Sequence, residues 1–361
     1  MTGLIWYDTN YTHETTQYLI VMKKLIILFV LLTTTFVSCR ESIKTSSSAK
    51  ADAKFEQISE DFMTGYLAWR PELSVYLGFH EFDGKTSDLS KESLVNELTR
   101  LKTCDQLLNE FDTASLSPGM HYDFSILQCG IKNEIFNFEE MEPFTRNPMS
   151  YASAIDVSIY IKRNFASLED RLKSIIAFEK NASAIFDAAR SNLSDSLAKQ
   201  YIETAILIAN GSADFLGNDL IIALKEVKND SLMDAFKTAN NKAISEVRDY
   251  VKYLKEEKLP KANNKYALGR EKYRKMLLYG EDISMPSEKI LDIGLAELQK
   301  EKEIFNATAK IINPNKKPVE VYQDLQKQHP TSDSLITDIK KNVQAIRQFL
   351  IDKKIVTIPS S

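Results

Sequence analysis

The chain has 361 residues, of which 43% are hydrophobic and 27% charged, and its formal net charge is −4. This balance excludes a chain that is disordered by composition, and the negative charge argues against a nucleic-acid binder. The sequence contains only 11 glycines and 10 prolines. That scarcity argues against Gly-rich phosphate loops and turn-dense β-sandwiches, and it favours long helices.

Residues 1–39 are predicted to be an N-terminal extension followed by a bacterial lipoprotein signal peptide. Met22 is followed by two lysines and then by an apolar run from Leu25 to Val37. This run is shorter than the ~20 residues of a membrane-spanning helix. Residues 36–39, Phe-Val-Ser-Cys, resemble a lipobox, in which Cys39 becomes the new N-terminus and carries a lipid. Translation is then expected to start at Met22. The alternatives are an ordinary exported protein and an uncleaved anchor.

Residues 40–54, with three serines at their centre, are predicted to form a flexible tether between the lipid and a folded domain. Together with Cys39, this predicts an exported bacterial lipoprotein that is anchored to the lipid bilayer at the periplasmic or cell-surface face. Cys104 and Cys129 remain in the body of the chain, and both have apolar neighbours at helical spacing. They are therefore expected to be buried free thiols, with a disulfide between them as the alternative.

Residues 55–361 are predicted to form one helical domain, because apolar residues recur there at spacings of three and four. Ser117-Pro118 is typical of a helix start, and residues 167–170, Ser-Leu-Glu-Asp, form a capping-box pattern that opens another helix. Further helices are expected at about 197–228, 231–257 and 286–309, and over a segment from Leu335 to Leu350. The predicted fold class is all-α, a multi-helix bundle.

The end of the chain differs from this helical pattern. Residues 355–359, Ile-Val-Thr-Ile-Pro, form a β-branched run that predicts a short C-terminal strand. The sequence offers no plausible partner strand for it. It is therefore an orphan strand, and the alternative is a frayed tail.

A series of short segments along the chain resembles one known bacterial family. These segments are Trp69-Arg70-Pro71-Glu72, Gly78-Phe79-His80-Glu81-Phe82-Asp83, Asp88-Leu89-Ser90, Asn147-Pro148-Met149-Ser150-Tyr151, residues 159–165, residues 168–172, residues 188–193, residues 266–273, His329-Pro330 and Val356-Thr357-Ile358-Pro359. Each segment is weak alone, but their order is specific. The chain resembles the N-terminal half of the family called domain of unknown function 885, which is grouped with the helical zinc metallopeptidases.

The resemblance implies a zinc site in the later half of full-length members, on an H-E-x-x-H helix whose histidines bind zinc and whose glutamate is the general base. This sequence lacks the motif, because His80-Glu81 is followed by Phe82, Asp83 and Gly84. No catalytic residue, metal ligand or cofactor is therefore assigned to this chain. Zinc is expected for the full-length family alone.

Four residues are candidates for contacts with a peptide substrate. Tyr273 and Gly269 lie on a segment that, by the resemblance, lines the substrate cleft, where a tyrosine hydroxyl would bind a peptide or an oxyanion. Arg163 and Arg171 are candidates for bidentate binding of a substrate carboxylate. The structural alternatives are that Tyr273 packs on a neighbouring helix, that Gly269 permits a close approach, and that the two arginines form ion pairs.

The sequence thus predicts the N-terminal, substrate-cleft half of a membrane-anchored zinc metallopeptidase-like protein, inactive alone. One alternative is a non-catalytic helical lipoprotein that binds peptides or another ligand. Another is one half of a split peptidase, in which a separate polypeptide supplies the C-terminal half. The predicted partners are accordingly the lipid bilayer through Cys39, peptides and that separate half, with no nucleic acid.

Overall fold

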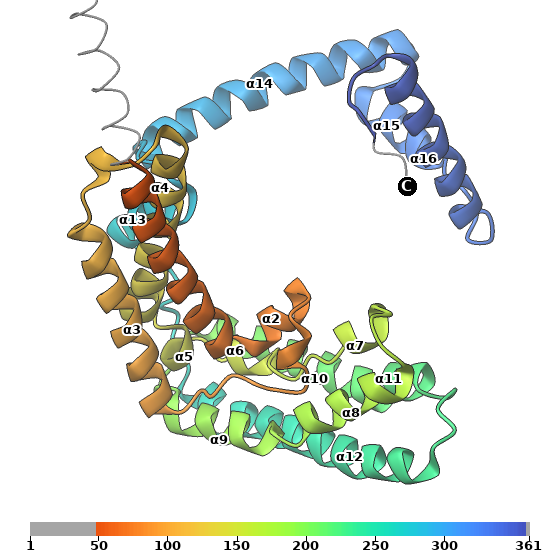
Figure 1. Cartoon of the computed structure of the whole chain (residues 1–361). Helices are drawn as coiled ribbons and strands as arrows, with labels where there is room; N and C mark the ends of the chain where they lie inside the picture. The colour runs from red at the N-terminus through yellow and green to blue at the C-terminus, as the bar shows by residue number, and fades with distance from the viewer. Residues whose placement is uncertain (1–47, 359–361) are drawn as a thin grey trace, which may run out of the picture. The chain divides into compact units, whose positions relative to one another are not determined.

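The computed structural model describes residues 48–358, which form two compact units (Figure 1). Unit 1 ends at Ser284 and unit 2 begins at Met285. The sequence predicted one domain over residues 55–361, and these residues fall into both units. The predicted extension and signal peptide (1–39), Cys39 and the first part of the tether (40–47) lie outside the described residues.

Unit 1 is built of helices, as predicted. Its first helix is described from residue 48 to residue 69. The α-helices that follow are α2 (Pro71–Leu77), α3 (Lys91–Asn109), α4 (Pro118–Phe136), α5 (Pro143–Arg146), α6 (Met149–Ala152), α7 (Ile159–Lys162), α8 (Leu168–Glu179), α9 (Ala182–Asn192), α10 (Lys199–Gly217), α11 (Asp219–Ala223), α12 (Asp230–Tyr253) and α13 (Arg270–Glu281). Short 3₁₀ segments are η1 (His80–Phe82), η2 (Thr113–Ser115) and η5 (Leu259–Lys261), and π segments are η3 (Asn137–Met141) and η4 (Leu254–Lys258).

The predicted helix starts are confirmed at two positions. Ser117 is the N-cap of α4 with Pro118 in the first turn, and Ser167 caps α8 by accepting a hydrogen bond from the N–H of Asp170 at 3.1 Å. The Ser167 side chain thereby satisfies an N–H group that a helix leaves unpaired at its start, whereas the Ser117 side chain makes no capping hydrogen bond.

The tether predicted over residues 40–54 is wrong at its end, because residues 48–54 are already helical. Alanine and lysine, which dominate this stretch, are strong helix formers. The helix is also held in place, since Asp52 accepts a hydrogen bond from the N–H of Ser117 and Phe55 is buried.

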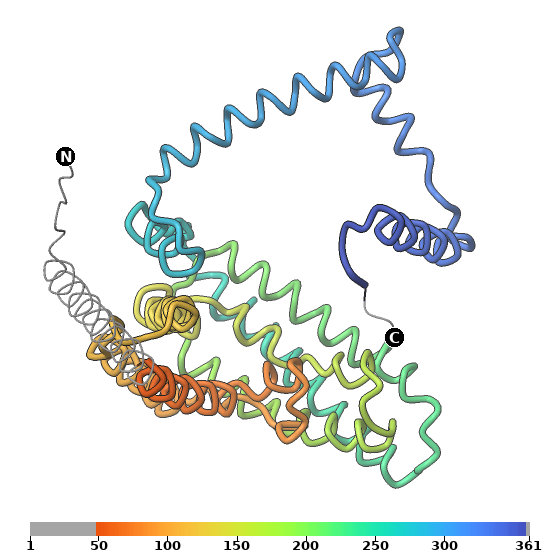
Figure 2. Tube along the Cα trace, turned by 45° about the horizontal axis from the view of Figure 1, so that its top comes forward, coloured from red at the N-terminus to blue at the C-terminus, as the bar shows by residue number. Residues whose placement is uncertain are grey.

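The core of unit 1 consists of two clusters of buried side chains. The larger lies among α6, α8, α9, α10 and α12, and the smaller among the helix of residues 48–69, α3 and α4. In the larger cluster α10 and α12 run side by side (Figure 2). Ala205 and Ala209 of α10 and Ala243 of α12 are fully buried, so small side chains let the two helices approach closely.

Residues Lys199–Ala223, which comprise α10 and α11, are the one helical stretch of the described chain that is long and apolar enough to cross a membrane. The same residues contribute Ile202, Ala205 and Ala209 to the protein core. Length and composition alone are therefore weak evidence for a membrane span here.

Unit 2 contains α14 (Ser287–Ile312), α15 (Pro318–Gln326) and α16 (Leu335–Asp352). Helices α14 and α15 contact each other, and Phe305 meets Tyr322 edge to face with ring centroids 6.3 Å apart. Among the described residues of this unit, only Ala309 and Val321 are buried.

The strand predicted at residues 355–359 is wrong for residues 355–358, and Pro359 lies outside the described chain. Two residues after the end of α16, Lys354 has a φ of 51°, and the N–H of Ile355 donates to the carbonyl of Leu350 at 3.1 Å. The N–H of Lys354 bonds to the carbonyl of Ile351. This pattern is a Schellman cap, so Ile355 completes a helix end and does not begin a strand.

Candidate functional site

A cleft of about 600 Å³ lies in unit 1, where five separate segments of the chain meet. These segments are the end of the first helix, the end of α4 with η3, the α5 region, the α9–α10 loop and the stretch before α13. Its lining residues are Trp69, Arg70, Glu134, Asn137, Phe138, Glu140, Met141, Glu142, Pro143, Phe144, Arg146, Asn147, Ser194, Ser196, Leu197, Ala198, Tyr201, Asn263, Lys265, Tyr266, Ala267, Leu268 and Lys272.

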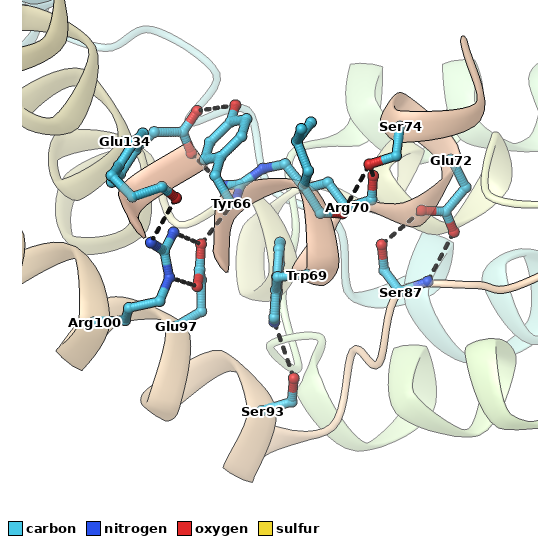
Figure 3. A network of polar contacts seen from close by, with 12 residues as sticks. Tyr66, Trp69, Arg70, Glu72, Ser74, Ser87, Ser93, Glu97, Arg100 and Glu134 are labelled. Carbon is cyan, nitrogen blue, oxygen red and sulfur yellow. Dashed lines mark hydrogen bonds and ion pairs between the residues drawn. The ribbon is translucent and has the colours of Figure 1, made fainter. Parts of the chain in front are cut away.

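One end of the cleft rests on a balanced network of charges (Figure 3). The Arg70 guanidinium donates to Glu97 at 2.8 Å and to Glu134 at 2.6 Å, while Arg100 donates twice to Glu97. The Glu97 side chain is almost fully buried. Two cations thus match two carboxylates, which is how a protein tolerates buried charge.

The same network fixes the aromatic surface beside it. Arg70 stacks on the ring of Tyr66, with its guanidinium carbon 3.8 Å from the ring centroid, and it lies over the ring of Trp69. The Trp69 indole donates to Ser93 Oγ at 3.0 Å (Figure 3). Burial raises the pKa of Tyr66, and the Arg70 charge partly opposes that rise. Arg70 therefore positions Trp69 and Glu134 at the cleft, and both terminal nitrogens of its guanidinium are engaged in hydrogen bonds.

The π segment η3 forms a second wall. Its last bond runs from the N–H of Glu142 to the carbonyl of Asn137 at 2.8 Å, and Glu142 has a φ of 50°. Lys272 donates to the carbonyl oxygen of Glu140, and Lys275 bonds to the Glu140 carboxylate. These contacts hold α13 against the end of α4, and the hydrogen bond that Lys275 donates to the Glu140 carboxylate raises the pKa of Lys275. π segments are rare and occur frequently at functional sites.

We call residues 262–269, which lead from η5 to α13, the strap. Asn263 of the strap forms a parallel β-bridge with Ala198. Its N–H donates to the carbonyl of Leu197 at 2.9 Å, and its carbonyl accepts from the N–H of Lys199 at 2.8 Å. The strap therefore pairs like a strand with the start of α10.

A buried lysine holds the α9–α10 loop in place. Lys258 is 6% exposed, and its ammonium donates to the carbonyl oxygen of Ser194 at 2.9 Å, close to the C-terminal end of α9. Burial lowers the pKa of Lys258. A cation at this position complements the helix dipole and satisfies carbonyl groups that the helix leaves free.

Two of the predicted site residues lie beside this cleft. Gly269 is the N-cap of α13 with a φ of 81°, a conformation that favours glycine, and it follows Leu268 of the cleft lining. Tyr273 lies one turn further along α13 and is 40% exposed. Neither residue lines the cleft itself, and the roles proposed for them stay predictions.

The other two predicted residues, Arg163 and Arg171, lie elsewhere in unit 1. Arg163 donates to the carbonyl of Tyr76 at 2.6 Å, and its guanidinium lies over the Tyr76 ring. Arg171 is buried and donates to the carbonyls of Tyr160, Arg163 and Ala166 and to Asn164 Oδ1. The structural alternative expected ion pairs. The partners are instead backbone carbonyls and the Asn164 side chain, and the contacts of Arg171 brace the loop between α7 and α8.

Sequence reasoning missed most of the cleft as a site, although a signal for part of it was present. The family-like segments 69–72, 147–151 and 266–273 each contribute lining residues. Glu134, η3 and the α9–α10 loop carry no such signal, because their approach to the cleft depends on how distant helices pack.

The described residues contain no group of three or more His, Cys, Asp or Glu side chains arranged to hold a metal ion. His80 stacks on Phe165 with ring centroids 3.8 Å apart, and its Nδ1 lies 3.3 Å from Asp83. The residues present therefore do not fit a zinc site. Cys104 and Cys129 are free thiols as predicted, but both are half-buried and not buried as expected.

The model of a family described as "Bacterial protein of unknown function (DUF885)" matches residues 71–361. The chain belongs to this family. The resemblance inferred from the ordered segments is thereby confirmed at the level of the family.

A solved structure described as "a putative lipoprotein of unknown function from Shewanella oneidensis" has a similar fold, with a TM-score of 0.65 and 20% sequence identity. The similarity covers 84% of this chain and 58% of that chain, so this DUF885 chain spans little more than half of its structural neighbour. No protein of curated function matches the sequence.

Proposed function

We propose that this DUF885 chain is the substrate-cleft half of a metallopeptidase-like lipoprotein and that its unit 1 cleft binds peptides. The observation that carries the proposal is the convergence of three family-like segments, 69–72, 147–151 and 266–273, on one cleft of about 600 Å³. That volume is in the range of ligand pockets, which combine apolar surfaces with a few placed polar groups.

The chemistry of the lining suits a peptide. Trp69, Phe138 and Phe144 offer aromatic surfaces, and the amides of Asn137 and Asn147 offer both donors and acceptors. Carboxylates and cations both line the cleft, and Glu142 pairs only loosely with Arg146 at 3.5 Å. Such a mixture matches a chain of amides with varied side chains better than it matches a single anion.

Catalysis is not part of the proposal for this chain alone, because the described residues do not provide the zinc ligands that a metallopeptidase needs. The lipoprotein part of the proposal rests on the lipobox-like residues 36–39 and on Cys39 as the lipid-bearing residue. The Shewanella structure, which is described as a putative lipoprotein, is in keeping with it. A peptide-binding lipoprotein without any catalytic partner is the alternative within the same cleft.

The experiment that tests peptide binding uses a fluorescein-labelled, sequence-degenerate octapeptide library and measures fluorescence polarisation against the purified chain. Tyr266→Ala is expected to weaken binding about tenfold, because it removes an aromatic face from the cleft. Tyr122→Ala is the matched control, since Tyr122 is an exposed tyrosine on α4 outside the cleft. Absence of saturable binding, or equal loss in both variants, would contradict the proposal.

The inactivity of the chain alone is tested separately. Zinc is titrated into the chain, and hydrolysis of the same peptides is followed by mass spectrometry. We expect no stoichiometric zinc binding and no cleavage. Tight one-to-one zinc binding together with cleavage would overturn this part of the proposal and leave the peptide cleft in place.

A separate C-terminal half as a partner is favoured by one observation in unit 2. Side chains on one stripe of α16, including Ile339, Val343 and Ile346, are 47–59% exposed. Contiguous exposed apolar stripes generally mark a surface that another polypeptide covers. Mixing the chain with the part of the Shewanella protein that has no counterpart here should give a complex on gel filtration, and Val343→Glu should abolish it.

A further inference from the structure

The strap has a free main-chain edge inside the cleft. Lys265, Tyr266, Ala267 and Leu268 all line the cleft, and residues 264–269 contain no helix, turn or bend. Within residues 48–358, the N–H groups of Tyr266, Ala267 and Leu268 donate to no acceptor. The carbonyl oxygens of Lys265 and Ala267 likewise accept from no donor in that range.

These free groups occur where a strand would place them. In a strand, alternate residues direct their N–H and C=O groups to the same edge. Lys265 and Ala267 are alternate residues and together offer one free N–H and two free carbonyls, because the N–H of Lys265 already bonds to Asn263 Oδ1 at 2.8 Å. Asn263, two residues earlier, is paired with the start of α10 as a β-bridge.

The strap is also held at both of its ends. Before it, Lys261 pairs with Asp195 at 3.0 Å and its carbonyl accepts from Ser196 Oγ. After it, Gly269 begins α13, which Lys272 ties to η3. A segment that is fixed in place loses little conformational entropy when a ligand pairs with it.

We propose that an extended peptide binds in the cleft by pairing its main chain with residues 265–268 of the strap, as an added strand. This inference rests on the proposed function of the unit 1 cleft and names how the peptide is held. Main-chain pairing accepts many sequences, because every residue except proline carries the same donor and acceptor. The aromatic residues Trp69, Phe138 and Phe144 then contact the side chains of the peptide and supply its selectivity.

The test leaves the protein unchanged and alters the peptide. The full chain is titrated with the fluorescein-labelled octapeptide library and with the same library N-methylated at alternate residues, in both possible phases. N-methylation removes the donor and keeps the side chain. We expect one of the two phases to bind at least about tenfold more weakly, which corresponds to the loss of two hydrogen bonds.

A second arm changes the protein. Ala267→Pro removes one free N–H and is expected to weaken binding several-fold, whereas Ala267→Gly keeps the N–H and serves as the matched control. Hydrogen exchange followed by mass spectrometry reports the bound state, in which the amide of Ala267 in the unaltered chain should become protected.

The outcomes separate the two proposals. If the unmodified library binds and both N-methylated libraries bind equally well, with no protection of the strap, main-chain pairing is overturned and the peptide cleft stands. If no library binds, the proposed function fails and this inference fails with it. Selective loss in one phase together with strap protection supports both.

Discussion

The two units of this DUF885 protein differ in what covers their apolar side chains. In unit 1, α12 buries Phe236, Ala243, Val247 and Tyr250 against neighbouring helices. In unit 2, α16 has an equally regular apolar stripe, yet none of its residues is buried. A helical pattern therefore states which face of a helix is apolar, and it does not state whether a partner for that face is present in the same chain.

The largest difference that we expect between the units is in hydrogen exchange. Amides of α8, α10 and α12 should be protected at least ~10³-fold more strongly than amides of α16, because their opening requires the core of unit 1 to unfold. The measurement is exchange mass spectrometry of the full chain at neutral pH. Equal protection of α16 and α12 would show that α16 is covered in solution and would break the comparison.

A smaller effect is expected from the charge network. Glu97→Gln should lower the free energy of unfolding of unit 1 by roughly 4 kcal/mol, because it leaves two guanidinium groups facing a neutral amide in a buried site. Chemical denaturation measures the change, and Glu92→Gln is the control on the exposed side of the same helix. A loss below about 1 kcal/mol would mean that the network is far better hydrated than its burial implies.

Truncating one apolar side chain in each unit sharpens the comparison directly. Leu172→Ala in α8 should cost about 3 kcal/mol, because Leu172 is fully buried and its removal leaves a cavity. Ile339→Ala in α16 should change the stability by less than about 0.5 kcal/mol, since Ile339 is 47% exposed. Denaturation curves of both variants give the answer, and similar losses would contradict the contrast between the units.

The smallest effect concerns the pH dependence of unit 1. Burial raises the pKa of Glu179 from 4.5 to about 8, and among the described residues its carboxyl oxygens have no hydrogen-bond partner. The folded state therefore keeps a proton that the unfolded state loses above pH ~4.5. The contribution of Glu179 to the free energy of unfolding consequently falls as pH rises from about 4.5 to about 8.

Glu179→Gln should remove this dependence. At pH 6.5 the variant is expected to be about 2 kcal/mol more stable than the unaltered chain, relative to their difference at pH 5. Denaturation at several pH values in this range tests the expectation. Glu226→Gln, at an exposed position, should run parallel to the unaltered chain. Parallel curves for Glu179→Gln as well would show that the buried carboxyl is ionised in the fold.

The helices were predictable from sequence because local patterns determine them. Ser117-Pro118 and Ser167 marked helix starts that the structure contains, since caps act within one turn. The predicted strand at residues 355–359 failed because the competing factor, the left-handed cap at Lys354, belongs to the helix before it. A β-branched run indicates a preference for extended backbone, but a strand also needs a partner strand to pair with.

The site was less predictable than the fold. Segments 69–72 and 266–273 could be singled out, but nothing in the sequence states that Trp69 and Tyr266 line the same cleft. Arg171 is instructive, because an arginine at a helix start suggested a ligand or an ion pair. Its partners include carbonyl oxygens of a neighbouring loop. Every residue type carries a backbone carbonyl, so a pattern of residue types cannot predict which carbonyls an arginine will meet.

The two π segments have a consequence for the gene. Each π segment is followed by residues that line the cleft. Segment η3 leads into Glu142 and Pro143, and η4 is followed by η5 and then by the strap. One residue on a helix corresponds to about 100° of rotation and 1.5 Å of rise. A single-codon deletion within either π segment would therefore turn the outgoing chain away from the cleft, whereas the same deletion in an exposed loop would pass with little effect. Codons 137–141 and 254–258 are thus positions where this family should tolerate a change of residue more readily than a change of length.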